Sequence, residues 1–282
     1  MADRKEQVSL SPLTQKYRQK EANMFIRNNH DHKLAEEISR SAVRKSREKY
    51  WRCLEQVKQG AVECDEDKMK EIIINSSNDC ELLVIGEQHG ITRHREIVSD
   101  CFQKLKLNGV KYLALEYLPS NLQDSIDRFD KEDVEKIKRH VEKGWGNYGK
   151  DAVISIMHLI FQAKVWNVRI IGLDKSLDLP EEEYKQDREK SMFSMLGENL
   201  GKGKVLLMCG NDHSISAKKE FKDVKVLNIE MNGDGATRDN KIYLMRAIFE
   251  SGLNKKTFFL EKGSLNESDV SDYTIHFAEE KG

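Results

Sequence analysis

An apolar tetrapeptide leads directly into a Gly-x-x-His motif in the stretch Leu82-Leu83-Val84-Ile85-Gly86-Glu87-Gln88-His89. A second apolar run, Lys204-Val205-Leu206-Leu207-Met208-Cys209, leads in the same way into Gly210-Asn211-Asp212-His213. Short apolar runs bounded by glycine predict buried strands. In an open parallel sheet the carboxyl ends of the strands share one edge, and ligands bind at that edge. We therefore expect His89 and His213 to meet at one site.

Two further predicted strands also end at titratable side chains. The run at 110–115 is followed by Glu116 and Tyr117, and the run at 168–172 is followed at a short distance by Asp174. Acidic residues in such places also cap helices and form turns, so each one alone has an ordinary structural explanation. Their repetition after several strands favours a shared polar pocket.

The pattern from residue 81 onward predicts the fold class. Expected strands at 82–85, 110–115, 168–172, 204–209 and 224–229 alternate with expected helices at 91–107, 120–143, 151–166, 181–200 and 214–222. Alternation of this kind is typical of βαβ units, so we expect an α/β fold with a largely parallel open sheet flanked by helices. Apolar runs at 242–248, 256–260 and 273–277 indicate late strands at the sheet edge, parallel or antiparallel.

The first 75 residues differ from the rest and predict an α-helical N-terminal extension, with residues 76–282 forming the α/β domain. Helices are expected at about 11–28 and 32–59, and residues 1–60 contain 14 Lys and Arg against 8 Asp and Glu. A basic amphipathic segment can contact an anionic membrane. A charged, solvated face on helices that pack on the main domain is the alternative.

Composition excludes several classes of protein. A formal charge of −1 over 282 residues argues against a general nucleic-acid binder. No apolar stretch approaches the ~20 residues that cross a bilayer, and no secretory signal is recognised at the start of the sequence. Five cysteines without a C-x-x-C pair indicate a reducing compartment. The expected location is the cytoplasm, of the producing cell or of a cell into which the protein is delivered.

The residues at the predicted sheet edge suit two kinds of chemistry. A carboxylate and an imidazole such as Glu87 and His89 can orient and deprotonate a water molecule. Two imidazoles and a carboxylate, here His89, His213 and Glu116 (or Glu87), can instead hold a divalent metal ion that lowers the pKa of bound water. Residue types alone leave both options open.

Five other side chains are candidates for the same pocket. His94 follows His89 closely on the predicted next helix, and Arg188 can pair with a site carboxylate or a substrate anion. The aromatic residues Tyr117, Trp145 and Tyr148 either line the pocket or pack in the core.

The order of these motifs resembles the superfamily that groups ChaN-like haem-binding proteins, erythromycin-esterase-like hydrolases and TraB/Tiki-type proteins. The resemblance covers roughly residues 78–280. It rests on the paired Gly-x-x-His motifs, the segment Leu113-Ala114-Leu115-Glu116-Tyr117-Leu118-Pro119, Asp174, the pair Arg188-Glu189 with Met192, and Asp272-Tyr273-Thr274-Ile275-His276-Phe277. Related domains also occur in bacterial toxins.

The resemblance implies roles for particular residues. Glu87 and His89 would form the pair that activates water, Glu116 the acid of the second strand, Arg188 the arginine beside the site, and His213 the second-motif histidine. The chain differs from ChaN-type proteins in its lack of a recognisable secretion signal, and from Tiki-type proteins in its lack of a recognisable membrane anchor.

Three hypotheses follow for the function. The first is a hydrolase that acts on an ester or amide bond of a small molecule or peptide. The second is a ligand-binding protein of the ChaN kind, which would hold haem or a small ligand through a histidine or Tyr117. The third is a bacterial toxin or effector module, directed to a membrane by the helices of residues 1–60.

Overall fold

The computed structural model describes residues 32–232, 250–251, 253, 256–261 and 272–277. The chain divides into two compact units, Met1–Cys53 and Leu54–Gly282. The described residues of the first unit all belong to helix α2 (His32–Gly60), which matches the helix predicted for residues 32–59. The helix predicted for residues 11–28 lies outside the described residues.

The boundary between the compact units falls after Cys53, whereas the sequence analysis ended the helical extension at residue 75. Strand β1 (Val62–Glu63) and helix α3 (Glu66–Asn78) belong to the second unit, where β1 pairs with the sheet. The division into an extension and a domain, and the membrane contact of residues 1–60, stay predictions. Every helix in the described part of the chain is too short or too polar to cross a membrane.

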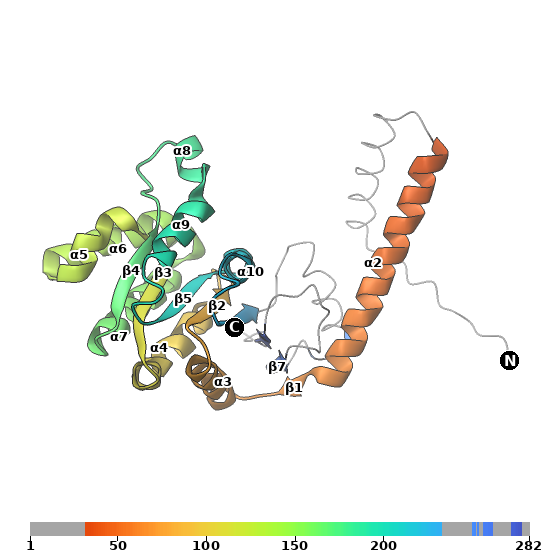
Figure 1. Ribbon diagram of the computed structural model, residues 1–282, viewed down its shortest axis with the longest axis horizontal. Helices are drawn as coiled ribbons and strands as arrows, with labels where there is room; N and C mark the ends of the chain where they lie inside the picture. The colour runs from red at the N-terminus through yellow and green to blue at the C-terminus, as the bar shows by residue number, and fades with distance from the viewer. Residues whose placement is uncertain (1–31, 233–249, 252, 254–255, 262–271, 278–282) are drawn as a thin grey trace. The chain divides into compact units, whose positions relative to one another are not determined.

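The second unit is built on one sheet, which has eight strands in the described residues and the order β1-β7-β8-β6-β2-β5-β3-β4 (Figure 1). Its further strands are β2 (Leu82–Glu87), β3 (Val110–Pro119), β4 (Arg169–Asp174), β5 (Lys204–Gly210), β6 (Val226–Asn232), β7 (Phe258–Glu261) and β8 (Tyr273–His276). The pairs from β8 through β4 are parallel, and β7 runs antiparallel to both β1 and β8. The predicted fold class, a largely parallel sheet flanked by helices, is confirmed.

The apolar runs predicted as late strands have different outcomes. The runs at 256–260 and 273–277 overlap β7 and β8; β7 is antiparallel to β8, and β8 is parallel to β6. The run at 242–248 lies outside the described residues.

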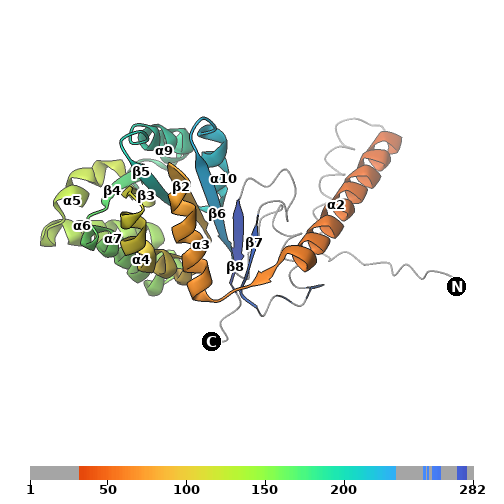
Figure 2. The ribbon, with the colours of Figure 1, turned by 60° about the horizontal axis from the view of Figure 1, so that its bottom comes forward.

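Helices cover both faces of the sheet. They are α4 (Thr92–Leu107), the short helix η1 (Ser120–Leu122), α5 (Gln123–Arg128), α6 (Lys131–Trp145), η2 (Gly146–Tyr148), α7 (Lys150–Val165), α8 (Glu181–Lys185), α9 (Arg188–Gly197) and α10 (Asn211–Glu220). Figure 2 shows α3, α4 and α7 along one face and α9 and α10 along the other.

Alternation along β2 explains why both faces are covered. Leu83 and Ile85 belong to the apolar core beneath α3, α4 and α7, whereas Leu82 and Val84 belong to the core beneath α9 and α10. All four side chains are fully buried. Successive strand residues point to opposite faces, so a continuous apolar run requires cover on both.

Two predicted helices are each divided in the structure. The helix predicted for 120–143 breaks at Phe129, which has a positive φ of 56°, and Asp130 then caps α6 by accepting a hydrogen bond from the Asp133 amide. The helix predicted for 181–200 breaks at Asp187, where φ is 52°. The second break places Arg188 in the first turn of α9, beside the carboxyl edge of the sheet.

An irregularity in β3 shapes the same edge. The register between β3 and β4 shifts between Leu115 and Pro119, so β3 contains more residues than β4 over this interval. Glu116 and Tyr117 lie in the shifted segment. Bulges of this kind often re-aim side chains next to functional sites.

Gly172 gives a test of this arrangement. A Cβ atom at Gly172 would lie 2.6 Å from the Pro119 carbonyl oxygen and 3.0 Å from that of Leu118. Because both atoms are backbone, we expect Gly172→Ala to lower the free energy of unfolding by about 1–3 kcal/mol. Urea unfolding measures the change. Gly146→Ala is the matched control, since a Cβ there meets nothing within 4 Å, and equal stability of the two variants would contradict the close approach.

Candidate active site

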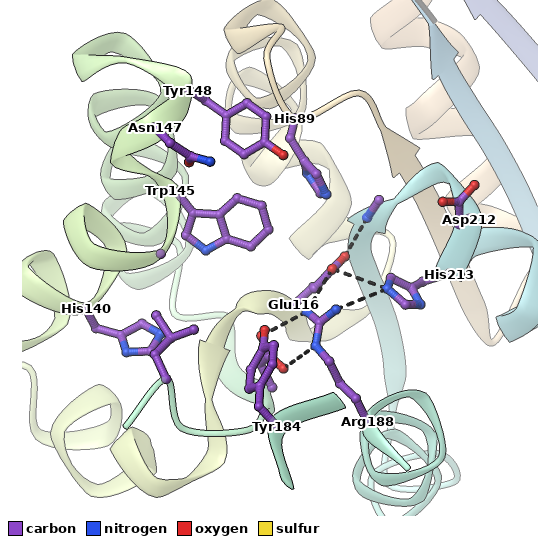
Figure 3. Close-up of a pocket in the computed structure, with 14 residues that line it drawn as sticks. His89, Glu116, His140, Trp145, Asn147, Tyr148, Tyr184, Arg188, Asp212 and His213 are labelled. Carbon is purple, nitrogen blue, oxygen red and sulfur yellow. Dashed lines mark hydrogen bonds and ion pairs between the residues drawn. The ribbon is translucent and has the colours of Figure 1, made fainter. Parts of the chain in front are cut away.

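A polar cavity of about 320 Å³ lies at the carboxyl ends of β2, β3, β4 and β5 (Figure 3). The predicted residues that line it are His89, Glu116, Asp174, Arg188 and His213. Each comes from a different segment, as expected for strand ends that share one edge of a parallel sheet. The structure therefore brings the two Gly-x-x-His motifs together around one cavity.

His89 is held in place by a buried carboxylate. Its Nδ1 lies 2.9 Å from Oε1 of Glu87, whose side chain is fully buried behind it. On the opposite edge of the ring, Nε2 is directed over Gly210: a Cβ built on that glycine would lie only 2.8 Å from Nε2. Gly210 thus leaves the room that the ring needs.

Arg95, from the first turn of α4, is the buried partner of Glu87. Its Nη1 donates to both carboxylate oxygens, at 2.5 and 2.7 Å, its Nε donates to Ser155, and its Nη2 donates to the His89 carbonyl. Burial alone would raise the pKa of Glu87, but the charge of Arg95 and the contact with His89 outweigh it, and the pKa is lowered. Glu87 is therefore a carboxylate that positions His89.

The far wall of the cavity contains a second arginine–carboxylate group. Arg188 donates through Nε and Nη2 to both oxygens of Asp174, at 2.7 and 2.9 Å, and through Nη2 to Glu116 at 3.0 Å. Glu116 also accepts the Gly210 amide at 2.6 Å. Burial acts to lower the pKa of Arg188, but the neighbouring carboxylates of Asp174 and Glu116 raise it by more. The pKa is therefore above its ordinary value, and the guanidinium stays charged.

His213 lies in the first turn of α10 beside this group. Its Nε2 is 3.4 Å from Nη1 of Arg188 and 3.5 Å from Oε1 of Glu116, as Figure 3 shows. Its Nδ1 is 2.9 Å from Oε1 of Glu189. His213 and His89 are each about one-fifth exposed, so both reach the cavity from partly covered positions.

Aromatic rings form a third wall. The rings of Trp145 and Tyr148 lie 4.6 and 5.8 Å from the His89 ring and are stacked on each other. Tyr117 lies behind them, fully buried and 6.2 Å from His89, and does not line the cavity. Burial, followed by the charge of Glu87, raises the pKa of the Tyr117 hydroxyl.

His94 lies outside the cavity as well. It is fully buried, its Nδ1 accepts the amide of Gln88 at 3.3 Å, and its ring packs on Phe277 at 4.6 Å. It supports the backbone that carries His89 and does not face the cavity.

Several residues of the site were not predicted as site residues. Arg95 is the most important, and a signal existed: it falls three residues before Val98 and seven before Phe102, on the buried stripe of α4. Tyr184, which donates to Asp174 at 2.8 Å, and His140 also line the cavity. Burial lowers the pKa of His140. Neither residue has a local sequence signal, because both reach the cavity through tertiary folding.

The predicted metal ligands do not form a metal cluster in the part of the chain that the structure describes. No group of three His, Cys, Asp or Glu side chains there is arranged to hold a metal ion. His89 and His213 lie on different walls, and both oxygens of Glu116 are engaged by Arg188 and the Gly210 amide. The geometry instead gives two histidines, each with a carboxylate at Nδ1.

Fold and cavity together define an α/β protein with a His- and carboxylate-lined pocket at the carboxyl edge of its sheet. Comparison with known proteins adds particular relatives. The type III effector HopBA1 of Pseudomonas syringae pv. aptata is 19% identical over 187 residues, which cover 60% of this chain and 78% of the effector. Its solved structure matches with a TM-score of 0.53 and 14% identity, over 75% of this chain and 94% of that one.

Two other solved structures are less similar. ChaN of Campylobacter jejuni, described with cofacially bound haem, has a TM-score of 0.45 and 15% identity over 77% of this chain and 96% of that one. RRSP, a MARTX toxin effector domain from Vibrio vulnificus, has a TM-score of 0.40 and 17% identity over 74% of this chain and 42% of that one. No protein-family model matches the chain. The fold of HopBA1 is thus shared, and membership of the wider superfamily stays a prediction.

The buried pair of Glu87 and Arg95 gives a prediction about stability. Arg95→Met leaves the Glu87 carboxylate buried without its main countercharge, so we expect unfolding free energy to fall by roughly 3–5 kcal/mol. The double variant Glu87→Leu with Arg95→Met removes both charges and should recover part of this loss. Urea unfolding of the four proteins in a double-mutant cycle measures the coupling.

Arg169→Met is the matched control for that cycle. Arg169 pairs with Asp127 at the surface, with more than half of its side chain exposed, so its loss should change stability by about 1 kcal/mol or less. If Arg95→Met and Arg169→Met lowered the free energy of unfolding by similar amounts, the buried pair would not be a special constraint on the fold.

His94 gives a prediction about pH. Burial lowers its pKa from the ordinary 6.5 to about 3, so the unfolded chain binds a proton here that the folded chain does not between these values. Stability should therefore fall as pH drops through this window, by up to about 1.4 kcal/mol per pH unit. Replacement by Gln removes the titrating group, so His94→Gln should lose less stability than wild type on acidification.

The measurement is urea unfolding near neutral pH and again about two pH units below the ordinary histidine pKa. His158→Gln is the control, because His158 is exposed on α7. If His94→Gln and wild type lose the same stability, the proton uptake on unfolding does not come from His94.

Proposed function

We propose that this chain is an effector-type hydrolase in which His89 activates a water molecule at the carboxyl edge of the sheet. The observation that carries the proposal is the setting of His89. Its Nδ1 is held at 2.9 Å by the buried Glu87, and its Nε2 faces the cavity. Because a carboxylate only accepts, the neutral ring carries its proton on Nδ1 and leaves Nε2 free to accept one.

The roles of the other residues follow from their contacts. Glu87 is a positioning residue, since its charge is already matched by Arg95 and its side chain has no access to the cavity. Arg188, on the opposite wall, supplies positive charge where negative charge develops on a carbonyl oxygen under attack, and His213 beside it supplies a ring nitrogen that can hydrogen-bond a bound substrate. A water molecule between the walls would give its proton to Nε2 of His89 and attack the carbonyl carbon of an ester or amide. The C–O or C–N bond to the leaving group would then break, and Nε2–H of His89 would return the proton to the departing alcohol or amine.

The size of the cavity bounds the substrate. At about 320 Å³ it is at the small end of ligand sites, which suits a small molecule or one side chain of a peptide. The stacked rings of Trp145 and Tyr148 offer an apolar surface beside His89, and the remaining walls are polar.

The effector part of the proposal is supported by the relative with the same fold. HopBA1 is a type III effector, and the match covers 94% of its solved chain. We propose that this chain likewise acts inside a cell into which it is delivered, and that the cavity carries out its chemistry there.

Substitution of His89 tests the activity. We expect His89→Ala to lower kcat/KM by ~10²–10⁴-fold, because a general base contributes about that factor. A panel of chromogenic esters and peptide amides, screened first with wild type, supplies the assay, and circular dichroism verifies the fold. His158→Ala, on the exposed face of α7, is the matched control.

For the effector role, the same variants are expressed inside eukaryotic cells, where only proteins with His89 should alter growth.

Full turnover by folded His89→Ala would overturn the proposal.

Haem binding is the second candidate, and it is favoured by the same atom: a histidine whose Nδ1 is held by a carboxylate presents Nε2 to iron in the form that ligates it. Haem titration decides between them. A Soret shift in wild type that is absent in His89→Ala, without hydrolysis of any substrate, would replace the hydrolase by a haem-binding protein.

A further inference from the structure

Glu189 is outside the residues to which a role has been given, yet it makes a close contact with His213. Its Oε1 lies 2.9 Å from His213 Nδ1. Glu189 directly follows Arg188 in the first turn of α9, so adjacent residues reach two neighbouring groups of the same wall. Arg188 holds Asp174 and Glu116, and Glu189 holds His213.

We propose that Glu189 is a positioning residue that fixes the ring and tautomer of His213, so that Nε2 faces the cavity as a proton acceptor. The importance of this for turnover rests on the proposed hydrolase function, whereas the tautomer is a property of the folded protein and does not depend on any substrate.

The shortest polar contact of the His213 ring sets its tautomer. The Glu189 carboxylate can only accept a hydrogen bond, so the Nδ1 that it contacts carries the proton. On the other side of the ring Nε2 lies 3.4 Å from Nη1 of Arg188, which can only donate, and 3.5 Å from Oε1 of Glu116, which can only accept. These two longer contacts oppose each other, so the 2.9 Å contact with Glu189 decides the tautomer and leaves the lone pair on Nε2. Which nitrogen of a histidine is protonated is set in this way by the hydrogen bond at the other one.

The result is a second carboxylate–imidazole pair that mirrors Glu87 and His89 across the cavity. In both pairs the carboxylate contacts Nδ1 and leaves Nε2 on the cavity side. The environments differ, because Glu87 is fully buried while the side chain of Glu189 is 44% exposed. A substitution at Glu189 therefore removes the contact without leaving a buried charge.

Glu189 also has an ordinary structural explanation, since an acidic residue in the first turn of a helix favours the helix dipole. If that were its only role, any loss of charge at this position would lower the stability of the helix and would leave the tautomer of His213 unchanged. The positioning role depends on an acceptor oxygen near Nδ1. Glu189→Gln keeps an acceptor and loses the charge, whereas Glu189→Ala loses both.

The experiment is a long-range ¹H–¹⁵N spectrum of the full chain labelled at histidine, with His213 assigned by its loss in His213→Gln. We expect the Nδ1–H tautomer in wild type, mainly the same tautomer in Glu189→Gln, and a shift toward Nε2–H in Glu189→Ala. Glu198→Ala, an exposed glutamate at the other end of α9, is the control and should leave the signal unchanged. An unchanged His213 signal in Glu189→Ala, or Nε2–H in wild type, would overturn the proposal.

A kinetic measurement separates this proposal from the proposed function. With a substrate in hand, Glu189→Ala should lower kcat by roughly 10-fold or more with little change in KM, and Glu189→Gln should recover part of the loss. If the spectrum changes as expected but no substrate is turned over, the positioning role stands and the hydrolase does not. If turnover depends on His89 while the His213 signal is the same in wild type and in Glu189→Ala, the hydrolase stands and the positioning role does not.

Discussion

The ion pair between Glu87 and Arg95 is the constraint on which the rest of the site depends. Each charge would lose several kcal/mol of hydration on burial, so the pair is tolerated only where the remaining hydrogen-bonding groups are also satisfied. Arg95 meets this condition by donating to Ser155 on α7 and to the His89 carbonyl as well as to Glu87. The pair therefore joins the end of β2 to two helices and fixes the backbone and the ring of His89 together.

On the opposite wall an arginine again balances buried carboxylates, but here the arginine side chain is partly exposed. Arg188 balances Asp174 and Glu116, and the Gly210 amide takes the remaining oxygen of Glu116. Each buried carboxylate of the site thus has a hydrogen-bond donor, and the partly exposed side chains that line the cavity include His89, His213 and Arg188. Carboxylates placed in this way orient the groups that can exchange protons with a ligand.

Much of the fold could be predicted from the sequence, because parallel strands covered on both faces are continuous apolar runs that end in glycine or acid. The same reasoning brought His89 and His213 to one cavity. It did not identify Arg95 as a site residue, because a charged residue on a helix is usually at the surface and only its partner Glu87 makes its burial favourable. It also did not separate α8 from α9, since the left-handed conformation of Asp187 depends on the contacts of Arg188 with the sheet edge.

His94 and Tyr117 illustrate the limit of sequence proximity. Both lie within a few residues of a cavity side chain, and both are fully buried behind the cavity. In a strand or a first helical turn, the neighbour of an exposed residue points elsewhere, so nearness along the chain does not predict a shared surface. The cavity is instead lined by residues distant in the sequence, such as Tyr184 and His140, which the tertiary fold brings to it.

The carboxylates that hold the two histidines differ in burial, and this difference bears on the roles of the two histidines in the proposed hydrolysis. His89 is fixed by a carboxylate and an arginine that are both completely buried, so its Nε2 has little freedom. His213 and Glu189 are partly exposed, and Glu189 closely follows the turn of the chain at Asp187. Proton abstraction demands accurate placement of the base, whereas contacts with a developing charge can adjust as a ligand enters. In the proposed hydrolysis, the wall with the buried carboxylate is therefore the one suited to activate water, and the more exposed wall is the one suited to adapt to what is bound.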